Sequence, residues 1–377
     1  MDESRSLQRA GCEVVVICPV GAGDASTTFE KRDGIEIHRF EPSPSSGGLL
    51  GYALEYLGAG WKIWRLIRRV SSARGFDVVQ ACNPPDVLLL VARAAGTRGA
   101  ALVFDHHDLV PELFESRFGG RGLAHAVARW LERVSFRLAD VVISTNESYR
   151  KIAIARGRKQ PEDVFVVRNG PDPDVLAQAG PVPELKRGKR FLLAYLGIMG
   201  PQDGVDHAVR ALAALRELRD DWHAVLAGDG DALPGLRHLA TELGLDDVVE
   251  FPGRIELPGI VDLLSTADVC LAPEPSSPLN DASTMVKIGE YMAFSRPIVA
   301  FDLPESRLTA GDAALYAVPN DKRQYAEQIA ELLDDEERRI GMGRLGRSRI
   351  EQRFSWAHSE QSLLRAYARA LEKRGAT

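Results

Sequence analysis

The sequence contains few cysteines and no long hydrophobic run. Its 377 residues include four cysteines, and none of them forms a CxxC pair. Scattered thiols are typical of a reducing cytoplasm, and they argue against a disulfide framework or a zinc site. No apolar run approaches the roughly 18 residues of a membrane span. The polar N-terminal stretch "MDESRSLQRAG" does not match a secretion signal. These absences predict a soluble cytoplasmic protein.

The chain also lacks an excess of positive charge. Its formal net charge is −6 and its pI is about 5.8, which gives no bulk attraction to nucleic acid. We therefore expect no nucleic-acid partner. Hydrophobic residues at 45% and charged residues at 27% are ordinary values for a globular protein. The length is sufficient for two domains with full cores.

Short β-branched runs alternate with helical patterns along the whole chain. The predicted strands of the first half are 12–18, 76–82, 101–105 and 140–145. Helical patterns at 49–73, 85–96, 122–138 and 147–156 lie around them. After a stretch rich in proline, glycine and charge, further strands are predicted at 190–197, 223–228, 247–253, 268–273 and 296–301. This order predicts an α/β protein with two Rossmann-like, doubly wound domains that face each other across a cleft.

The same pattern gives domain boundaries. We expect a first domain over 1–170, a linker over 171–189 and a second domain over 190–357. The helical segment at about 358–377 has no strand after it and is expected to pack back onto the first domain. A doubly wound domain normally opens with a strand, whereas this chain opens with a helix-like segment. The first strand of domain 1 is therefore expected to be missing.

The stretch "NDASTMVKIGEYMAFSRPIVAF" (280–301) has one acid inside an apolar helical pattern. Ser283 and Thr284 are favourable N-cap residues and predict a helix over 283–294, with Met285 on its core-facing stripe. The first turn of a helix offers unpaired N–H groups to an anion. Ser283, Lys287 and Glu290 share one stripe.

That stripe fits a nucleoside diphosphate. The phosphates would lie at the helix start beside Lys287, and Glu290 would accept hydrogen bonds from two ribose hydroxyls. The alternative is a surface helix on which both side chains are only solvated. The apolar strand that follows favours a buried helix.

Segments in a fixed order resemble family 4 of the GT-B glycosyltransferases, which are retaining enzymes that use nucleotide sugars. They include "FDVVQACNPPD", "FDHHDLVPELF", "RLADVVISTNESYR", "VFVVRNGPD", "YLGIMGPQDGVDHAVRA" and "KIGEYMAFSRPIVAF". The resemblance covers nearly the whole chain. It implies a GT-B fold, an acceptor-binding first domain, a nucleotide-sugar-binding second domain and a hexosyltransferase-type activity (EC 2.4). It also implies no cofactor, with a UDP-sugar as the default donor substrate.

The resemblance also assigns the two acids of an E-x7-E motif. Glu290 matches the second acid, which binds ribose in the family. The first acid falls on Ala282, so that half of the motif is absent. Asp281 lies one position away and is the candidate replacement in a catalytic role.

Other donor contacts follow from the same resemblance. The family's phosphate-binding Arg and Lys fall on Ile198 and Asp203, so both cations are missing. Donor contacts are expected at strand ends, at Gly197, Gly200, Gly228 and Arg254. Tight turns are the alternative role for the glycines, and a solvated side chain is the alternative for Arg254.

The motif "FDHHDL" (104–109) follows a predicted strand. The resemblance places His107 near the transferred sugar, as a second catalytic candidate. A metal site made of His106, His107 and Asp108 matches no common ligand spacing, and a structural histidine at a strand end is the other alternative. The DxD-like triplets at 229–231 and 172–174 lie in a turn and in the linker. We therefore predict no metal.

The segment "WKIWRLIRRVSSARG" (61–75) combines tryptophans with cations. Basic amphipathic helices of this kind can lie on anionic membranes. Burial of the tryptophans against the first domain's sheet is the commoner explanation. The sequence thus leaves open a peripheral location at the inner face of a membrane.

These observations predict transfer of a sugar, with retention, from a nucleotide sugar to an unidentified acceptor: a glycan, a lipid-linked molecule or a small molecule. Acceptor choice would depend on the loops at 42–50, 83–86 and 107–122. Two alternatives stay open. One is an enzyme like the UDP-sugar 2-epimerases, which share the architecture. The other is an inactive sugar-nucleotide-binding or partner subunit.

Overall fold

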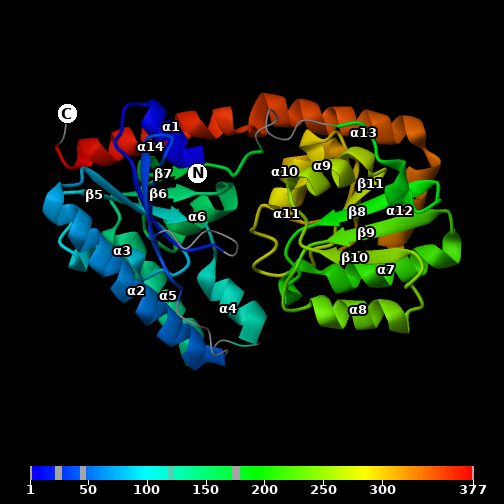
Figure 1. The fold of residues 1–377 in the computed structure, drawn as a ribbon, viewed down its shortest axis with the longest axis horizontal. Helices are drawn as coiled ribbons and strands as arrows, with labels where there is room; N and C mark the ends of the chain where they lie inside the picture. The colour runs from blue at the N-terminus through cyan, green and yellow to red at the C-terminus, as the bar shows by residue number, and fades with distance from the viewer. Residues whose placement is uncertain are drawn as a thin grey trace. The chain divides into compact units, whose positions relative to one another are not determined.

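The computed structural model describes residues 2–21, 28–42, 48–118, 120, 122–171 and 179–375. Contacts divide the chain into two compact units. Unit 1 contains Met1–Arg168 and Ala357–Thr377, and unit 2 contains Asn169–Trp356. The chain therefore leaves unit 1 once and returns to it at its end. Both units are α/β structures (Figure 1).

Unit 2 is built on a six-stranded parallel sheet. Its strands are β8 (Phe191–Leu196), β9 (Trp222–Ala227), β10 (Val249–Gly253), β11 (Val269–Ala272), β12 (Ile298–Phe301) and β13 (Ala314–Ala317). Its helices are α7 (Val205–Leu218), α8 (Leu233–Glu242), α9 (Leu257–Thr266), α10 (Val286–Ala293), α11 (Pro304–Ala310), α12 (Lys322–Asp334) and α13 (Glu336–Arg349). Leu193 and Tyr195 of β8 enter the core on one face, while Leu192 and Ala194 enter the core on the other. This two-sided burial is typical of a parallel sheet covered by helices.

The strand order of unit 2 reverses at β8. The order is β10-β9-β8-β11-β12-β13, so the chain adds strands first on one side of β8 and then on the other. In open parallel sheets, ligands bind outside the carboxyl ends of the strands at such a reversal. In unit 2 this point lies between the carboxyl ends of β8 and β11.

Unit 1 contains two separate sheets, in the orders β1-β3-β2 and β4-β5-β6-β7. The strands are β1 (Val15–Pro19), β2 (Phe29–Arg32), β3 (Ile35–Phe40), β4 (Val78–Cys82), β5 (Ala101–His106), β6 (Val141–Ser144) and β7 (Val164–Val166). The helices are α1 (Asp2–Arg9), α2 (Gly48–Ala73), α3 (Leu88–Ala94), α4 (Val110–Phe118), α5 (Leu123–Leu138), α6 (Glu147–Ala155) and α14 (Trp356–Lys373). Strand β2 is antiparallel to β3, and the other pairs are parallel.

Within the described ranges, β1 and β4 each have one edge without a partner strand. Ile17 of β1 and Val79 of β4 pack against the same small cluster around Ile67 of α2, yet the two strands are not hydrogen-bonded to each other. Most of their residues are half-buried, whereas β5 is buried along its whole length. Strand β5 is therefore covered on both faces, whereas β1 and β4 are covered only in part.

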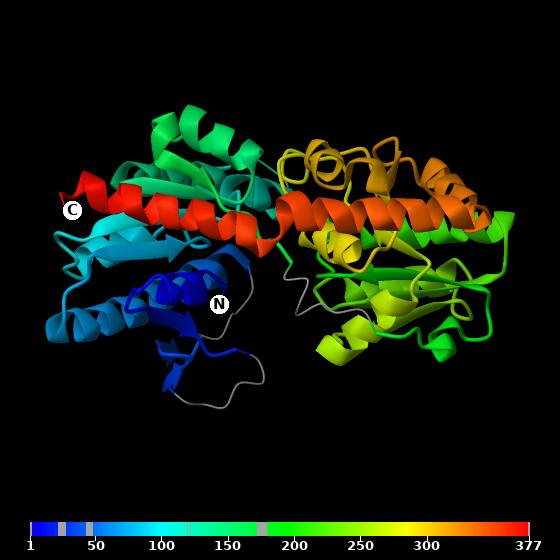
Figure 2. The ribbon, with the colours of Figure 1, turned by 90° about the horizontal axis from the view of Figure 1, so that it is seen from above.

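Helix α14 belongs to unit 1, where it lies beside α1 (Figures 1 and 2). Arg9 of α1 forms an ion pair with Glu360 at 2.7 Å, and Arg369 pairs with Asp163 at 3.0 Å. The first pair joins α14 to α1, and the second joins α14 to the turn that precedes β7. Among the described residues, no helix is both long and apolar enough to span a membrane.

Candidate functional site

Helix α10 begins later than its hydroxyl side chains predicted. It starts at Val286, with Met285 as an N-cap residue that has no side-chain cap. The Ser283 hydroxyl donates to the carbonyl of Leu279 at 2.7 Å, and the Thr284 hydroxyl donates to Glu305 at 3.3 Å. The prediction of a helix from 283 with Ser283 as its cap is wrong, because these side chains bond to the preceding turn and to α11.

Lys287 lies in the first turn of α10 and is buried. Its Nζ forms an ion pair with Glu274, which follows β11, and donates to the Tyr195 hydroxyl on β8 at 3.0 Å. Burial lowers the pKa of the Lys287 ammonium, but Glu274 and Tyr195 outweigh this effect and its pKa lies above the usual value. Lys287 is therefore a protonated side chain held at the strand-order reversal. The alternative of a Lys287 side chain solvated on a surface helix does not hold, because this side chain is buried.

Two glycines bring backbone segments together at the carboxyl ends of β8 and β9. A Cβ atom on Gly228 (φ +149°) would lie 1.8 Å from the carbonyl oxygen of Gly197. A Cβ atom on Gly197 would lie 2.8 Å from Cε of Lys287. No side chain fits at either position. Gly200 belongs to a turn, because its N–H donates to Asp203 at 2.9 Å.

Glu290 lies one turn after Lys287 on α10. Its side chain is half-buried, and burial raises its pKa while the Lys287 charge lowers it. The carboxylate accepts no hydrogen bond from the part of the chain that the structure describes. Only Lys287 and Glu290 of the predicted stripe lie within the helix.

Asp281 and Arg254 occupy loops of the same unit. Oδ2 of Asp281 accepts from the Ser276 hydroxyl at 3.1 Å, while Oδ1 is buried without a hydrogen-bond partner among the described residues. Arg254 follows β10 directly and is exposed. The structure thus places Asp281 before α10 and Arg254 at the carboxyl edge of the sheet.

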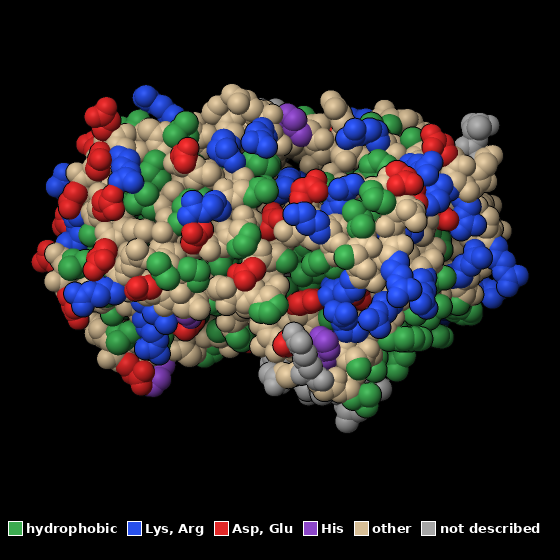
Figure 3. All heavy atoms as spheres, turned by 180° about the vertical axis from the view of Figure 1, so that it is seen from behind, with side chains coloured by type: hydrophobic (Ala, Val, Ile, Leu, Met, Phe, Trp, Pro, Cys, Tyr) green, Lys and Arg blue, Asp and Glu red, His purple; other side chains and the backbone are tan. Residues whose placement is uncertain are grey.

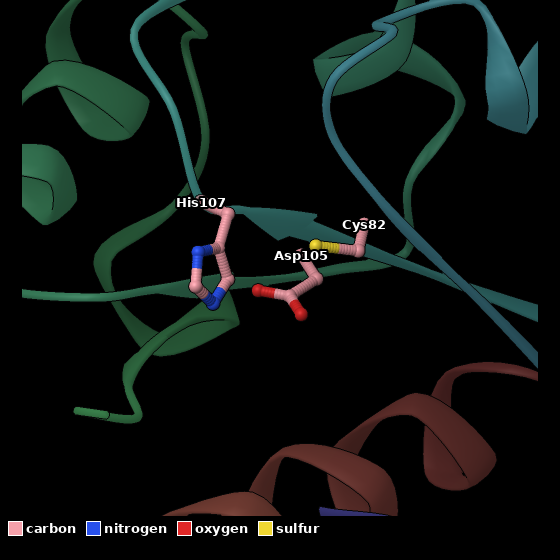
Figure 4. Close-up of side chains that lie close together, drawn as sticks. All are labelled: Cys82, Asp105 and His107. Carbon is pink, nitrogen blue, oxygen red and sulfur yellow. The ribbon is translucent and has the colours of Figure 1, made fainter. Parts of the chain in front are cut away.

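His107 lies in unit 1, where it directly follows β5. The backbone N–H of His107 donates to Oδ1 of the buried Asn83 at 2.7 Å. The side chains of Cys82, Asp105 and His107 converge (Figure 4), with their potential ligand atoms all within 4.8 Å of one another. This is the one group found among the described residues that could hold a metal ion. The alternative set with His106 does not form, because His106 is fully buried against Phe136.

A second acid, the half-buried Glu3, lies beside Asp105 of this group. Gln80 donates to Glu3 at 2.6 Å and to Asp105 at 3.1 Å. Burial raises the pKa of Asp105 to about 7, and burial together with the nearby Asp105 raises the pKa of Glu3 to about 7. The carboxyl edge of unit 1 therefore holds acids that titrate near neutral pH.

Sequence analysis missed Glu274 and Tyr195 as partners of Lys287. Glu274 follows β11 after a single proline, at the edge of the sheet where ligands bind. Its position at the end of a buried strand was the one feature of the sequence that could have identified Glu274 as a candidate site residue. Its pairing with a lysine thirteen residues later depends on the fold.

Two family models match most of the chain. A glycosyl transferase 4-like domain matches residues 1–170, and a "glycosyl transferases group 1" model matches residues 190–335.

Curated relatives are similar at modest identity. The 2-deoxystreptamine glucosyltransferase of Streptomyces kanamyceticus is 27% identical over 67% of this chain and 65% of its own length. The D-inositol 3-phosphate glycosyltransferase of Corynebacterium aurimucosum is 28% identical over 62% of this chain and 58% of its own. The chain thus spans less than two thirds of the length of these relatives.

Solved structures share the fold. Sucrose-phosphate synthase from Thermosynechococcus elongatus superimposes with a TM-score of 0.78 at 17% identity, covering 100% of this chain and 92% of that one. Anabaena HepE in complex with UDP-glucose superimposes with a TM-score of 0.69 at 18% identity, covering 93% and 98%. The fold is GT-B, as predicted. With both family models matched in order, the chain belongs to family 4 of the GT-B glycosyltransferases.

Proposed function

We propose that the protein is a retaining, metal-independent glycosyltransferase that moves a sugar from a nucleoside-diphosphate sugar to an acceptor. The proposal rests on Glu290, whose half-buried carboxylate accepts no hydrogen bond from a described residue. A carboxylate with two available acceptor oxygens suits the vicinal hydroxyls of ribose. Its helix begins at the strand-order reversal of unit 2, where doubly wound sheets bind ligands. Family membership supports the reaction class.

The start of α10 is the proposed diphosphate site. It has no side-chain cap, and helix starts favour anions. Lys287 lies in the same turn, where its charge is already paired with Glu274. Gly197 and Gly228 are proposed to contact the donor through their backbone groups, because protein atoms occupy the space that a side chain would fill at either position. Arg254 is assigned to the nucleobase side. UDP is the proposed nucleotide, and the UDP-glucose complex of Anabaena HepE supports this choice.

The proposed reaction is a front-face displacement. The bond from the anomeric carbon to the diphosphate oxygen breaks with its electron pair, and the acceptor oxygen bonds to the same face of that carbon. The acceptor's proton passes to the leaving phosphate oxygen. Such a step needs no enzyme nucleophile or cofactor, and preorganised donors lower its barrier by stabilising the leaving diphosphate. His107 is proposed to hold a sugar hydroxyl, and Asp281 to replace the absent first acid.

The test is calorimetric titration of UDP into the Glu290→Ala variant. Loss of a charged hydrogen-bond acceptor should weaken binding by about 10-fold or more. Glu337→Ala removes an exposed acid of α13 and should bind UDP as the unchanged protein does. Equal affinity of the Glu290→Ala variant would rule out the ribose role.

A sugar-nucleotide-binding subunit without turnover is the second candidate. It is favoured by the absence of cations at Ile198 and Asp203 and by the open edges of β1 and β4 among the described residues. Turnover of a panel of sugar nucleotides and acceptors in the presence of a chelator distinguishes the two. Product formation supports the metal-independent transferase, and a new sugar nucleotide formed without acceptor would indicate an epimerase.

The proposal includes peripheral contact of residues 61–75 with the inner face of a membrane. Trp61 is exposed, whereas Trp64 is half-buried and donates to the carbonyl of Ala94 at 3.3 Å. Trp61 is thus available for membrane contact, whereas Trp64 is partly buried within unit 1, as the alternative explanation expects.

A further inference from the structure

Helices α2, α3 and α5 form one layer of unit 1. Helices α3 and α5 lie in successive connections between the parallel strands β4, β5 and β6, and right-handed connections place them on the same face of the sheet. Helix α3 packs against both α2 and α5, and the three helices lie together in Figure 1. Their outward sides therefore belong to one surface, here called the α2/α5 face.

Large apolar side chains are exposed along this face. On α2, Leu57 and Trp61 are four residues apart, and Trp61 is 57% exposed. On α5, Leu123, Val127 and Trp130 follow helical spacing, with Leu123 at 83% and Trp130 at 58% exposure. Two exposed tryptophans on neighbouring helices indicate an interaction surface, because single exposed apolar residues are ordinary and grouped ones are not.

Each apolar stripe continues into arginines. The α2 stripe reaches Arg65 and Arg68, and the Arg65 guanidinium lies 5.0 Å from the Trp61 ring centroid. The α5 stripe reaches Arg133 and Arg137, both exposed. Figure 3 shows Lys and Arg side chains beside hydrophobic ones at its lower right.

The face is almost free of acids. The single acid of α5 is Glu132, which is fully buried and paired with Arg156. The single acid of α2 is Glu55, and α3 has none. A chain with a net charge of −6 therefore keeps a basic surface at this one helical layer, which indicates an anionic partner.

Apolar and basic residues lie next to each other along the two helices. Trp61 and Arg65 are one turn apart on α2, and Trp130 and Arg133 are three residues apart on α5. Helix α2 ends just before β4, and α5 ends just before β6, so Arg68 and Arg137 lie toward the amino edge of the sheet. Insertion of the tryptophans and contact of the neighbouring arginines with headgroups can occur together on a flat bilayer.

We infer that the α2/α5 face docks on an anionic lipid bilayer, with Trp61 and Trp130 entering the interface and the arginines contacting lipid phosphates. Tryptophan and leucine on one part of a helix with arginines beside them is the composition of interfacial helices. Cations beside an anionic surface are attracted to it, so each exposed arginine of this face strengthens the contact. The inference extends the membrane contact proposed for 61–75 to a second helix and stands independently of the sugar-transfer reaction.

The test is flotation of the full chain with vesicles. We expect binding to phosphatidylcholine vesicles that contain phosphatidylglycerol and little binding to phosphatidylcholine alone. Trp61→Ser with Trp130→Ser should weaken binding at least about tenfold, and Arg65→Gln with Arg133→Gln should remove the preference for phosphatidylglycerol. Ile340→Ser and Arg344→Gln on α13 are matched exposed controls and should leave binding unchanged.

Circular dichroism of each variant checks that it is folded, which is expected because the substituted side chains are exposed. Equal binding of the paired tryptophan variant and the unchanged protein would overturn the inference, as would absence of binding to both vesicle types. Concentration-dependent self-association that the tryptophan substitutions abolish, without vesicle binding, would also overturn it and would identify the face as an interface between copies.

Discussion

Individual carboxylates in this protein have different partners and therefore different roles. Glu274 is buried in an ion pair with Lys287, whereas Glu290 accepts no hydrogen bond from the described residues. The buried Asp105 and the half-buried Glu3 both accept a hydrogen bond from the Gln80 amide. One is thus a structural partner, one is available to a ligand, and two hold protons near neutral pH.

The stability of unit 1 should fall as pH rises from about 4 to 7. The pKa values of Asp105 and Glu3 move from the usual 3.8 and 4.5 to about 7 in the folded state. Between these values the folded protein holds protons that the unfolded chain has released. The free energy of unfolding therefore decreases with rising pH, by up to about 1.4 kcal/mol per pH unit for each proton.

Chemical denaturation across this pH range measures the effect. The Asp105→Asn variant should lose less stability between pH 4 and 7 than the unchanged protein, because its amide does not titrate. Burial also raises the pKa values of Asp86 and Glu132 to about 7. Both acids are present in the variant and in the unchanged protein, so their contribution to the pH dependence cancels in the comparison. Parallel curves for the two proteins would contradict the assignment.

Sequence reasoning singled out Glu290 and Lys287 as candidates because an acid and a lysine inside an apolar helix are unusual locally. The prediction that Ser283 caps the helix was wrong, because capping preference considers only hydrogen bonds from a hydroxyl to the turn that follows it. Here the hydroxyl bonds to Leu279 in the preceding turn. Sequence reasoning missed Glu274 because that pairing joins two elements that only the fold brings together.

At the scale of elements, strands with a continuous apolar run were predictable. The predicted strands over 12–18, 76–82, 101–105, 140–145, 190–197, 223–228, 247–253, 268–273 and 296–301 overlap β1, β4, β5, β6, β8, β9, β10, β11 and β12. Strand β2 has the sequence FEKR and is largely exposed, so it lacks the apolar signal of a buried strand. Strand β13 was missed although it is no shorter than β6, β11 or β12.

The Lys287–Glu274 pair connects α10 to the end of β11, and breaking it should destabilise unit 2. Lys287→Met would leave the Glu274 carboxylate buried without its cation, at a cost of about 3–5 kcal/mol. Replacing both partners, as Lys287→Met with Glu274→Gln, should recover much of that loss because no buried charge remains. Urea denaturation measures both variants.

An exposed pair in the same unit provides the control. Arg307 and Asp302 are bonded at 2.7 Å but are about half exposed, so Arg307→Met should cost at most about 1 kcal/mol. A double variant no more stable than Lys287→Met would show that Glu274 does not carry the charge that makes the single substitution costly.

At the scale of the whole molecule, strand and helix alternation predicted two doubly wound units, and the GT-B fold is as expected. Strands β1 and β4 belong to separate sheets. The only sign of this in the sequence is that it opens with a helical pattern where a doubly wound domain normally has a strand. Which edges remain open depends on strand order, and a single sequence does not contain that order.

Unit 2 should fold as an isolated fragment, because Asn169–Trp356 is continuous and has its own core. Unit 1 should not fold without α14, which contributes the buried residues Leu363, Ala366 and Ala370. Fragments 169–356 and 1–168 test this by circular dichroism and thermal melting. Fragment 169–356 should melt cooperatively, and fragment 1–168 should not; a cooperative transition in fragment 1–168 would contradict the role assigned to α14.

The placement of α14 has a consequence for biosynthesis. Domains usually fold in the order in which the ribosome releases them. Here the core of unit 1 cannot close until α14 has been synthesised, whereas unit 2 is complete before α14. The part of unit 1 that precedes unit 2 therefore exposes apolar surface until α14 emerges, and chaperones that hold such surfaces would engage it.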